Sequence, residues 1–370
     1  MGRTKIWLDC DPGHDDAMAI MLAGHSPSVE LLGLSTVAGN QTVEKTTVNA
    51  LRVLSLADIR GVDVVMGQGA PLMRESKVCP EIHGSSGLGT RSGQEVPDLP
   101  PVGRLIPKKG ALSQTLAIVH MYDVISQHGD GEVVLVATGS LTNVALLLMV
   151  FPEVKAKLAQ IVLMGGAMGI GNTGPVAEFN IQCDPEAAKV VFECGVKLVQ
   201  VTHTCLVTDE VVKALEAFDS PFGRLMIDLL QFFAQTYKDI FFFDFPPLHD
   251  PLTIAYVIDP SIFQTKLLRV DIETSSELSY GQTVVDVWQM SLKPRNVHVA
   301  QRVDVPAFWE LMLAALRKAN ERSPLNSLPA GAPSEEVAGE VKQAMEPTDD
   351  TSAREAGLAA PLPERPMVPH

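Results

Sequence analysis

The chain reads IWLDCDPGHDD at residues 6–16, so four carboxylates fall within eight residues directly after an apolar run. Side chains alternate along a strand, and a strand that ends in this stretch therefore carries Asp9 and Asp11 on one face, about 6.7 Å apart. The Pro-Gly pair that follows turns the chain. Asp15 and Asp16 then open an apolar helical pattern, at the helix N-terminus where carboxylates are favoured. The stretch predicts a strand, a turn and a helix that meet at an acidic corner.

This acidic corner predicts a bound cation. Two unit charges about 5 Å apart repel by about 3 kcal/mol at an effective dielectric of about 20, so several partly buried carboxylates need a compensating positive charge. A hard divalent metal that prefers oxygen ligands is the natural one. The simpler alternative is a capped helix start whose aspartates are solvated, which suffices for one or two acidic residues. Four of them at one corner favour the metal.

Two other acidic motifs compete for the same residues. A calcium-binding helix-loop-helix would need an acidic residue or Asn in place of Gly13 and a Glu in place of Ile20, and both are missing. A phosphotransferase of the haloacid dehalogenase type also begins with Asp-x-Asp after a strand. It usually carries Thr or Val two residues after its second Asp, where His14 or its neighbour Gly13 stands in this chain. This phosphotransferase stays open as the weaker alternative.

Length and charge narrow the class of protein. The chain has 370 residues, of which 46% are hydrophobic, so it can bury a large core in one or two domains. The formal net charge is -15, from 44 acidic and 29 basic residues. This balance argues against nucleic acid and anionic membranes as partners.

The N-terminal segment predicts no targeting signal. Only three apolar residues stand between Lys5 and Asp9, too few for a signal-peptide core, and Ile6 occupies the position where N-myristoylation needs Ser or Thr. No run reaches the roughly 20 apolar residues of a membrane helix. The five cysteines are odd in number and lack C-x-x-C spacing, which favours a reducing compartment. We therefore expect a cytoplasmic protein.

Up to about residue 200 the sequence alternates short apolar runs with longer helical stretches. Continuous Val and Leu runs such as 133–136 are typical of strands covered on both faces, so we expect an α/β fold, an open and mostly parallel sheet flanked by helices. The expected strands are 5–10, 29–37, 62–66, 132–137, 160–164 and 196–202. The expected helices are 43–56, 112–126, 141–150, 185–193 and 209–218.

The pattern of apolar and polar residues changes towards the C-terminus. Val- and Thr-rich alternating stretches at 268–272, 283–288 and 297–303 suggest a few antiparallel strands, and a last helix begins at Pro306. From residue 321 to residue 370 the chain is rich in Pro, Ala, Glu and Ser and has no aromatic residue, which predicts a disordered tail. Residues 1–320 are predicted to form one domain.

Polar residues follow the expected strands. In parallel sheets ligands bind beyond the carboxyl ends of the strands, so these residues are the ones that would face a ligand. Glycines let the backbone approach a ligand closely, and Asn, Glu and Asp offer hydrogen bonds suited to hydroxyl groups. These residue types suit a sugar as the ligand. Neither a Gly-x-x-x-x-Gly-Lys loop nor a Gly-x-Gly-x-x-Gly after a strand indicates a phosphate site.

Taken together, these segments resemble the inosine-uridine preferring nucleoside hydrolase family, whose signature is Asp-x-Asp-x-Gly-x-Asp-Asp near the N-terminus. The resemblance covers roughly residues 5–320 and is specific, because separate motifs recur in order. They are the aspartate cluster, Ala38-Gly39-Asn40, His83-Gly84 with Gly87-Leu88, Ala137-Thr138-Gly139, Leu163-Met164-Gly165-Gly166, Glu178-Phe179-Asn180 with Asp184-Pro185, and His249-Asp250-Pro251. The likeness implies the Rossmann-like α/β fold of that family, a Ca²⁺ ion, and a homodimer or homotetramer.

The resemblance also implies roles for single residues. The calcium ligands would be Asp11, Asp16, Asp250 and the backbone carbonyl of Thr138, and ribose hydroxyls and a water would complete a shell of about six to eight oxygens. Substrate contacts would come from Asp15, Asn40, His83, Met164, Asn172, Glu178, Phe179, Asn180 and Tyr237. Among these, Asp15 and Asn180 would hold the 2′- and 3′-hydroxyls of ribose. Asn172 and Glu178 would take the 5′-hydroxyl, where a carboxylate repels a 5′-phosphate.

The implied chemistry is hydrolysis of an N-glycosidic bond. The reaction passes through an oxocarbenium-like sugar, which surrounding carboxylates stabilise. By the likeness, calcium orients a water, Asp11 removes its proton, and the attack falls on C1′. His249 is the candidate that protonates the leaving base, and His83 would line the base pocket. Asp9 would brace the acidic loop from behind the metal ligands.

Structural roles compete for several residues. His14 lies inside the aspartate cluster, and a structural role is favoured for it. The Gly- and Ser-rich loop 84–93 after His83 looks mobile. The aromatic run 232–245 could be core, with Tyr237 stacking on the base instead. Cys10 is expected to fill the opposite face of its strand.

The sequence therefore predicts an enzyme of the EC 3.2.2 class, a calcium-dependent ribonucleoside hydrolase that releases ribose and a free base in purine and pyrimidine salvage or breakdown. Two alternatives stay open. One is a metal-dependent phosphotransferase with Asp9 as its nucleophile. The other is a nucleoside-binding protein without turnover, against which intact Asp11 and His249 argue.

Overall fold

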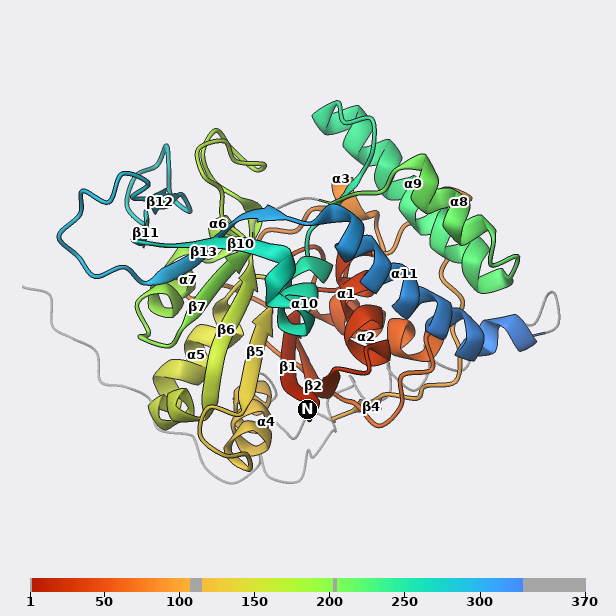
Figure 1. The fold of residues 1–370 in the computed structure, drawn as a ribbon, viewed down its shortest axis with the longest axis horizontal. Helices are drawn as coiled ribbons and strands as arrows, with labels where there is room; N and C mark the ends of the chain where they lie inside the picture. The colour runs from red at the N-terminus through yellow and green to blue at the C-terminus, as the bar shows by residue number, and fades with distance from the viewer. Residues whose placement is uncertain (1, 107–114, 202–204, 329–370) are drawn as a thin grey trace, which may run out of the picture.

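The structure is a computed structural model, and it describes residues 2–106, 115–201 and 205–328. Within these residues the centre is a nine-stranded sheet (Figure 1). Across the sheet the strands are β10 (Phe263–Leu268), β13 (Val297–Val303), β7 (Leu198–Val201), β6 (Leu158–Met164), β5 (Val133–Ala137), β1 (Thr4–Cys10), β2 (Val29–Thr36), β3 (Asp63–Met66) and β4 (Arg104–Leu105). Only β10 and β13 pair antiparallel in this described sheet, so the predicted α/β fold with a mostly parallel sheet is confirmed.

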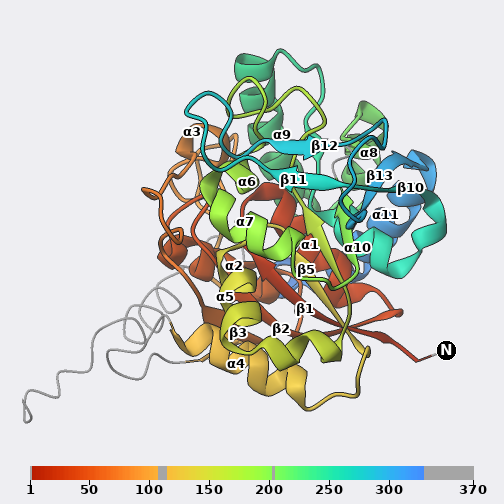
Figure 2. The same cartoon turned by 90° about the vertical axis from the view of Figure 1, so that its left-hand side faces the viewer.

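Two hydrophobic cores, one on each face, enclose the sheet. Residues of β1 alternate between them, because Ile6 and Leu8 face one core while Trp7 faces the other. The first core contains helices α1 (His14–His25), α2 (Val43–Leu56), α9 (Pro221–Phe241), α10 (Pro251–Ile258) and α11 (Val305–Arg322). The second contains α4 (Thr115–Ser126), α5 (Thr142–Val150) and α7 (Pro185–Phe192), which lie on the side seen in Figure 2.

Shorter elements complete the described chain. A two-stranded antiparallel sheet pairs β11 (Val270–Ile272) with β12 (Thr283–Val285), which confirms antiparallel strands towards the C-terminus. A second one pairs β8 (Cys205–Leu206) with β9 (Pro247–Leu248). The remaining elements are α3 (Pro80–His83), α6 (Phe179–Cys183), α8 (Asp209–Glu216) and three 3-10 helices, η2 (Pro152–Lys157), η3 (Pro260–Ile262) and η4 (Pro324–Ser327).

Helix α9 is the largest element that the sequence pattern did not predict. Its buried large apolar side chains are Phe222, Met226, Leu229, Leu230, Phe233 and Tyr237, which recur at helical spacing on one face. The density of aromatic residues masked this period. Residues 112–114 of the expected helix 112–126, and Thr202 of the expected strand 196–202, lie outside the described residues.

The last described residues pack on the body of the protein. Helix α11 runs to Arg322, and Asn326 in η4 accepts a hydrogen bond from the backbone N–H of Phe222 at 2.9 Å. The segment 321–328 of the predicted tail therefore has tertiary contacts, while residues 329–370 lie outside the described residues. Among the described helices, none combines the length and the apolar character that crossing a bilayer requires.

The register of the central strands brings the polar motifs to one edge. Asp9 in β1 lies beside Ser35 in β2 and beside Ala137 in β5. All three strands run in the same direction, so the residues that follow them emerge together. These residues are the acidic corner after β1, Asn40 after β2 and Thr138 after β5.

Candidate active site

Three carboxylates meet where α1 and α10 begin. Oxygen atoms of Asp15, Asp16 and Asp250 lie within 4.8 Å of one another, and all three residues are buried. Burial raises the pKa of Asp15 to about 7, with a further rise from the charge of Asp16. Burial, then the charges of Asp15 and Asp16, also raises the pKa of Asp250. These are the groups that a cation would stabilise in their charged form.

Asp16 is held by four hydrogen-bond donors. One oxygen accepts the hydroxyl of Thr138 at 2.8 Å and the backbone N–H of Asp11 at 3.3 Å. The other accepts the backbone N–H of Gly13 and the side-chain amide of Asn40, both at 3.1 Å. Strand β5, the turn after β1 and the loop after β2 thus converge on one carboxylate.

The carboxylate of Asp11 is surrounded closely by the backbone of residues 39–40 and of Gly139. Its Oδ2 accepts the backbone N–H of Asn40 at 2.8 Å, and among the described residues its buried Oδ1 has no hydrogen-bond partner. A Cβ added at Gly39 would lie 2.1 Å from Oδ2, and one at Gly139 would lie 2.6 Å from Oδ1. Only glycine fits at these two points. Burial, followed by the charge of Asp16, raises the pKa of Asp11 well above its usual range.

The donor set fits a hard divalent cation. It offers buried carboxylate oxygens, an orphaned oxygen on Asp11 and a backbone carbonyl on Thr138, which are the ligand types that Ca²⁺ prefers. The group brought within 4.8 Å contains Asp15, for which the sequence suggested a ribose contact, beside the suggested ligands Asp16 and Asp250. Asp11 joins this group through its backbone bond to Asp16.

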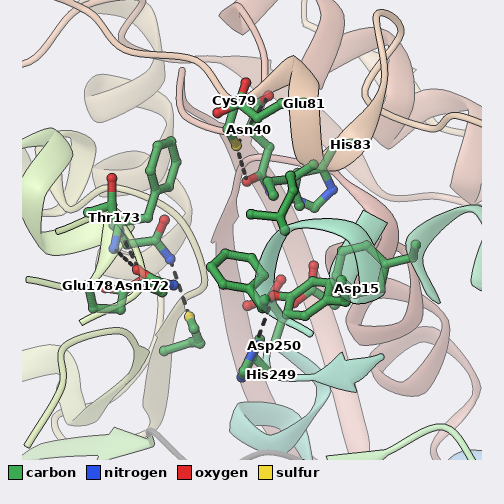
Figure 3. A pocket seen from close by; sticks show the side chains of 18 of the residues that line it. Asp15, Asn40, Cys79, Glu81, His83, Asn172, Thr173, Glu178, His249 and Asp250 are labelled. Carbon is green, nitrogen blue, oxygen red and sulfur yellow. Dashed lines mark hydrogen bonds between the residues drawn. The ribbon is translucent and has the colours of Figure 1, made fainter. Parts of the chain in front are cut away.

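A cavity of about 320 Å³ opens beside the carboxylates, a size that suits a small ligand (Figure 3). Every residue suggested for substrate contact lines it, together with Thr138, His249 and Asp250. Asp11 and Asp16 lie behind this wall. The cavity is also lined by residues that the sequence did not single out for the site, namely Cys79, Glu81, Ile82, Thr173, Phe233, Ile240 and Phe241. Phe233, Tyr237 and Phe241 recur every four residues, and that spacing could have identified one helix face.

One wall of the cavity is polar. Glu178 precedes α6 and accepts backbone N–H groups of Gly166 at 2.8 Å, Asn180 at 3.0 Å and Ile181 at 3.2 Å. Burial raises its pKa although these donors lower it. Asn172 accepts the backbone N–H of Phe179 at 2.8 Å. Figure 3 shows Asn172 and Glu178 across the cavity from Asp15.

The side-chain amide of Asn180 connects this wall to the metal-ligand candidates. It donates to the backbone carbonyl of Thr138 at 2.7 Å and lies 3.3 Å from the sulfur of Met164. Asn180 therefore stands between the end of β6 and the carbonyl suggested as a calcium ligand.

The other wall is aromatic and carries two histidines, His83 and His249. Nε2 of His249 lies 3.4 Å from the hydroxyl of Tyr237, and the ring of Tyr237 meets Phe233 edge-on. His83 lines the cavity, while His14 lies behind it with its ring stacked on His83. Burial lowers the pKa of His14 to about 4 and that of His83 well below its usual value, so both are neutral near pH 7.

The loop 84–93, which the sequence suggests is mobile, is held at several points. Gln41 donates to the carbonyl of Gly84 at 3.0 Å and Asn49 to that of Ser86 at 2.9 Å. Asp228 in α9 accepts the backbone N–H of Ser92 at 2.9 Å. These bonds fix the loop that follows His83 on α2 and α9.

Asp9 is not placed as a nucleophile. It is fully buried, does not line the cavity, and accepts hydrogen bonds from Ser35 at 2.5 Å and Asn143 at 2.8 Å. Burial raises its pKa to about 7. The contacts instead tie β1, β2 and α5 together behind Asp11.

Comparison with known proteins gives one consistent result. Residues 6–310 match the family model described as inosine-uridine preferring nucleoside hydrolase. A probable ribonucleoside hydrolase of Dictyostelium discoideum is 46% identical over 84% of this chain and 94% of its own length. A pyrimidine-specific ribonucleoside hydrolase RihA of Shewanella sp. (strain MR-4) is 40% identical over 85% of this chain and 96% of its own length. The solved structure of a purine-preferring ribonucleoside hydrolase from Gardnerella vaginalis is 30% identical, with a TM-score of 0.75, and covers 86% of this chain and 99% of its own.

Proposed function

Since the chain belongs to the inosine-uridine preferring nucleoside hydrolase family and is a ribonucleoside hydrolase, we propose that it uses Ca²⁺ and that Asp11 is its catalytic base. One observation supports this proposal above all, namely that the carboxylate group and the cavity are adjacent. Buried carboxylates, with an unpartnered oxygen on Asp11, stand directly beside a cavity of nucleoside size.

Asp16 and Asp250, with Asp11 and the carbonyl of Thr138, would hold the ion. When bound, the ion supplies positive charge that keeps the carboxylates ionised and binds ribose hydroxyls and water. Asp11 is the group that accepts the proton of the attacking water, because it is bonded to Asp16 of the carboxylate group and one of its oxygens is free of protein donors among the described residues. Its other oxygen is held by Asn40, which fixes its direction.

The polar wall binds the ribose. Asp15 and Asn180 take the 2′- and 3′-hydroxyls, next to the ion site, while Asn172 and Glu178 take the 5′-hydroxyl. The negative charges around the sugar stabilise the oxocarbenium character that develops as the bond to the base breaks. A 5′-phosphate would face Glu178, and this repulsion makes nucleosides rather than nucleotides the substrates.

The aromatic wall receives the base. His249 is the proposed general acid, and Tyr237 lies within 3.4 Å of its Nε2. Phe233, Tyr237 and Phe241 supply apolar and stacking surface. Relatives are named for pyrimidine and for purine preference, so both classes of base belong in the test.

The experiment incubates the protein with uridine, cytidine, inosine, guanosine and xanthosine, with and without a chelator, and measures free base by chromatography. We expect release of base that stops with the chelator and returns with added Ca²⁺. Asp250→Ala should lose bound calcium in elemental analysis, while Asp239→Ala, an exposed aspartate of α9, should keep it. Base release at the same rate with and without the chelator would reject the calcium assignment.

A further inference from the structure

One peptide group joins two buried side chains beside the cavity. It is the peptide between Gly165 and Gly166, directly after β6. Its carbonyl oxygen accepts a hydrogen bond of 2.9 Å from the side-chain amide of Gln200, and its N–H donates one of 2.8 Å to Oε2 of Glu178. Gln200 is fully buried in β7 and does not line the cavity, whereas Glu178 does. Gln200 therefore reaches the cavity through this peptide.

The two hydrogen bonds are coupled because a peptide group is planar. In a trans peptide the carbonyl oxygen and the N–H point in nearly opposite directions, so a bond that holds the oxygen also sets the direction of the N–H. The amide of Gln200 thus directs the N–H of Gly166 towards Glu178.

The two glycines permit this arrangement of the peptide. The φ angle is +148° at Gly165 and +77° at Gly166, a region that side chains rarely adopt. A Cβ at Gly166 would lie 2.3 Å from the amide nitrogen of Gln200 and 2.6 Å from Cγ2 of Thr283. Thr283 also holds the next residue, because its hydroxyl accepts the backbone N–H of Ala167 at 2.9 Å. The turn after β6 is thus packed directly against β7 and β12.

The bond from Gly166 decides which oxygen of Glu178 remains for a ligand. Each carboxylate oxygen can accept two hydrogen bonds. Oε2 accepts the backbone N–H groups of Gly166 and Ile181, at 2.8 and 3.2 Å, so both of its positions are filled. Among the described residues Oε1 accepts one such bond, from the backbone N–H of Asn180 at 3.0 Å. Oε1 is therefore the atom that can accept a hydrogen bond from a ligand.

We infer that Gln200 is a positioning residue for the ribose, which holds the Gly165-Gly166 peptide so that Glu178 presents Oε1 to the 5′-hydroxyl. This inference rests on the proposed function, which assigns the 5′-hydroxyl to Glu178, and it adds the buried residue that keeps this carboxylate in one orientation. A charged acceptor that is already oriented binds a hydroxyl more tightly than one that must be ordered when the substrate arrives.

The direct test observes this peptide without any turnover. Gly165-Gly166 is the only Gly-Gly pair among the 370 residues, so the full chain labelled with ¹³C-carbonyl glycine and ¹⁵N-glycine gives a single HNCO cross-peak. Gln200→Met keeps the length of the side chain but cannot donate a hydrogen bond. We expect it to move the carbonyl ¹³C shift of Gly165 and the amide ¹H shift of Gly166 upfield, as both bonds weaken. A native ¹H shift of Gly166 in this variant would overturn the inference, because Glu178 would then keep its bond without Gln200.

The matched control is Asn296→Leu. The side-chain amide of Asn296 donates to the backbone carbonyls of Phe192 and Val270, both at 2.9 Å, the same distance as in the bond from Gln200. Asn296 directly precedes β13 and does not line the cavity. This variant removes amide bonds at the opposite edge of the sheet, and its HNCO cross-peak should coincide with the native one.

The second test measures recognition of the 5′-hydroxyl. In Gln200→Met the kcat/KM for uridine should fall about tenfold, close to the contribution of one hydrogen bond to a charged group, while that for 5′-deoxyuridine should change little. Inosine and 5′-deoxyinosine form a second pair. Asn296→Leu should change both members of a pair equally. Equal losses on uridine and 5′-deoxyuridine in Gln200→Met would show a general structural role and overturn the inference.

Further outcomes separate this inference from the proposed function. If the native protein released no base from any ribonucleoside, the proposed function would fail, and the HNCO cross-peak would still decide whether Gln200 holds the peptide. If Glu178→Gln left the ratio of kcat/KM for uridine to that for 5′-deoxyuridine unchanged, the assignment of the 5′-hydroxyl to Glu178 would fail, and the inference with it. Should Gln200→Met not fold, Gln200→Leu gives the same two measurements, because leucine also lacks a donor.

Discussion

The hydroxyl of Thr138 donates a hydrogen bond of 2.8 Å to Asp16, across 122 residues of chain. Thr138 follows β5 and Asp16 lies in the first turn of α1, so this bond fastens the carboxyl end of the sheet to the helix that carries two of the clustered carboxylates. The carbonyl of Thr138, in turn, accepts the amide of Asn180. One residue thus orients a metal-ligand candidate with its side chain and a ribose-binding candidate with its backbone.

Thr138→Val should weaken calcium binding while it leaves the carbonyl in place. Loss of a hydrogen bond that orients a ligand typically costs about 10- to 100-fold in metal affinity. Calorimetric titration with Ca²⁺ measures the change. Thr142→Val is the control, because Thr142 donates to Asp184 at 2.7 Å in a buried pair outside the cluster. Comparable affinity loss in both variants would mean that general destabilisation is responsible.

Asp11→Asn should nearly abolish turnover while the protein stays folded. The amide keeps the shape of the side chain, but it cannot take a proton from water and it is a weaker metal ligand. Steady-state kinetics and circular dichroism measure the two properties. A kcat equal to that of the native protein would remove Asp11 from the mechanism.

The stabilisation that calcium gives should grow with pH. A carboxyl whose pKa is raised by folding holds its proton longer in the folded state, so the stability it contributes is present below the unfolded value of about 4 and is lost as the pH rises through the folded value. For Asp15 that folded value is about 7, and the pKa values of Asp11, Asp16 and Asp250 are raised as well. Without the ion, the free energy of unfolding therefore decreases as the pH rises and these buried carboxylates ionise. Bound Ca²⁺ compensates their charge and offsets this decrease.

Scanning calorimetry with saturating Ca²⁺ and with chelator checks this prediction. The difference in Tm should be small near about pH 5 and should increase towards about pH 8, where protons no longer compete for the carboxylates. Histidines titrate in both samples, so their effect cancels in the difference. A difference that stays constant with pH would argue that the ion binds away from these aspartates.

His249→Ala should lower kcat for inosine by about 10²-fold or more, the usual scale for the loss of a general acid. The loss should shrink for p-nitrophenyl riboside, whose leaving group departs without protonation. Calcium content should stay normal in this variant, unlike in Asp250→Ala. Equal losses on both substrates would show instead that His249 positions the ribose or supports Asp250.

Two truncations test where the folded body ends. Removing residues 329–370 should leave Tm and activity almost unchanged, because this Pro-, Ala- and Glu-rich segment offers little apolar surface to bury. Removing everything after Glu321 should cost at least about 1 kcal/mol of stability, since buried Ser323 and the bonds of Asn326 are lost. A large drop in Tm from the shorter truncation would mean that residues 329–370 dock on the body or on another subunit.

Much of the fold could be predicted because it depends on local patterns. The continuous apolar run 133–136 predicted a strand covered on both faces, and it lies at the centre of the sheet with a core on each side. Helix α9 was not predicted, because Phe232, Phe242 and Phe243 stand between and beyond the regularly spaced aromatic residues and obscure their helical period. Its role at the site depends on which loop it packs against, and that contact is made by Asp228 with Ser92, 136 residues apart.

The sequence by itself determined the acidic corner, the sheet and the kinds of side chain at the ends of its strands. A strand fixes which neighbours share a face, and a Pro-Gly turn before an apolar helical pattern fixes where the carboxylates go. Only the tertiary structure decided which oxygen of Asp11 lacks a donor, that Asp15 joins Asp16 and Asp250, and that His14 reaches His83. Such contacts join segments far apart in the chain, and they form only after helices and loops have packed on the sheet to within a few ångströms. No local periodicity encodes that packing.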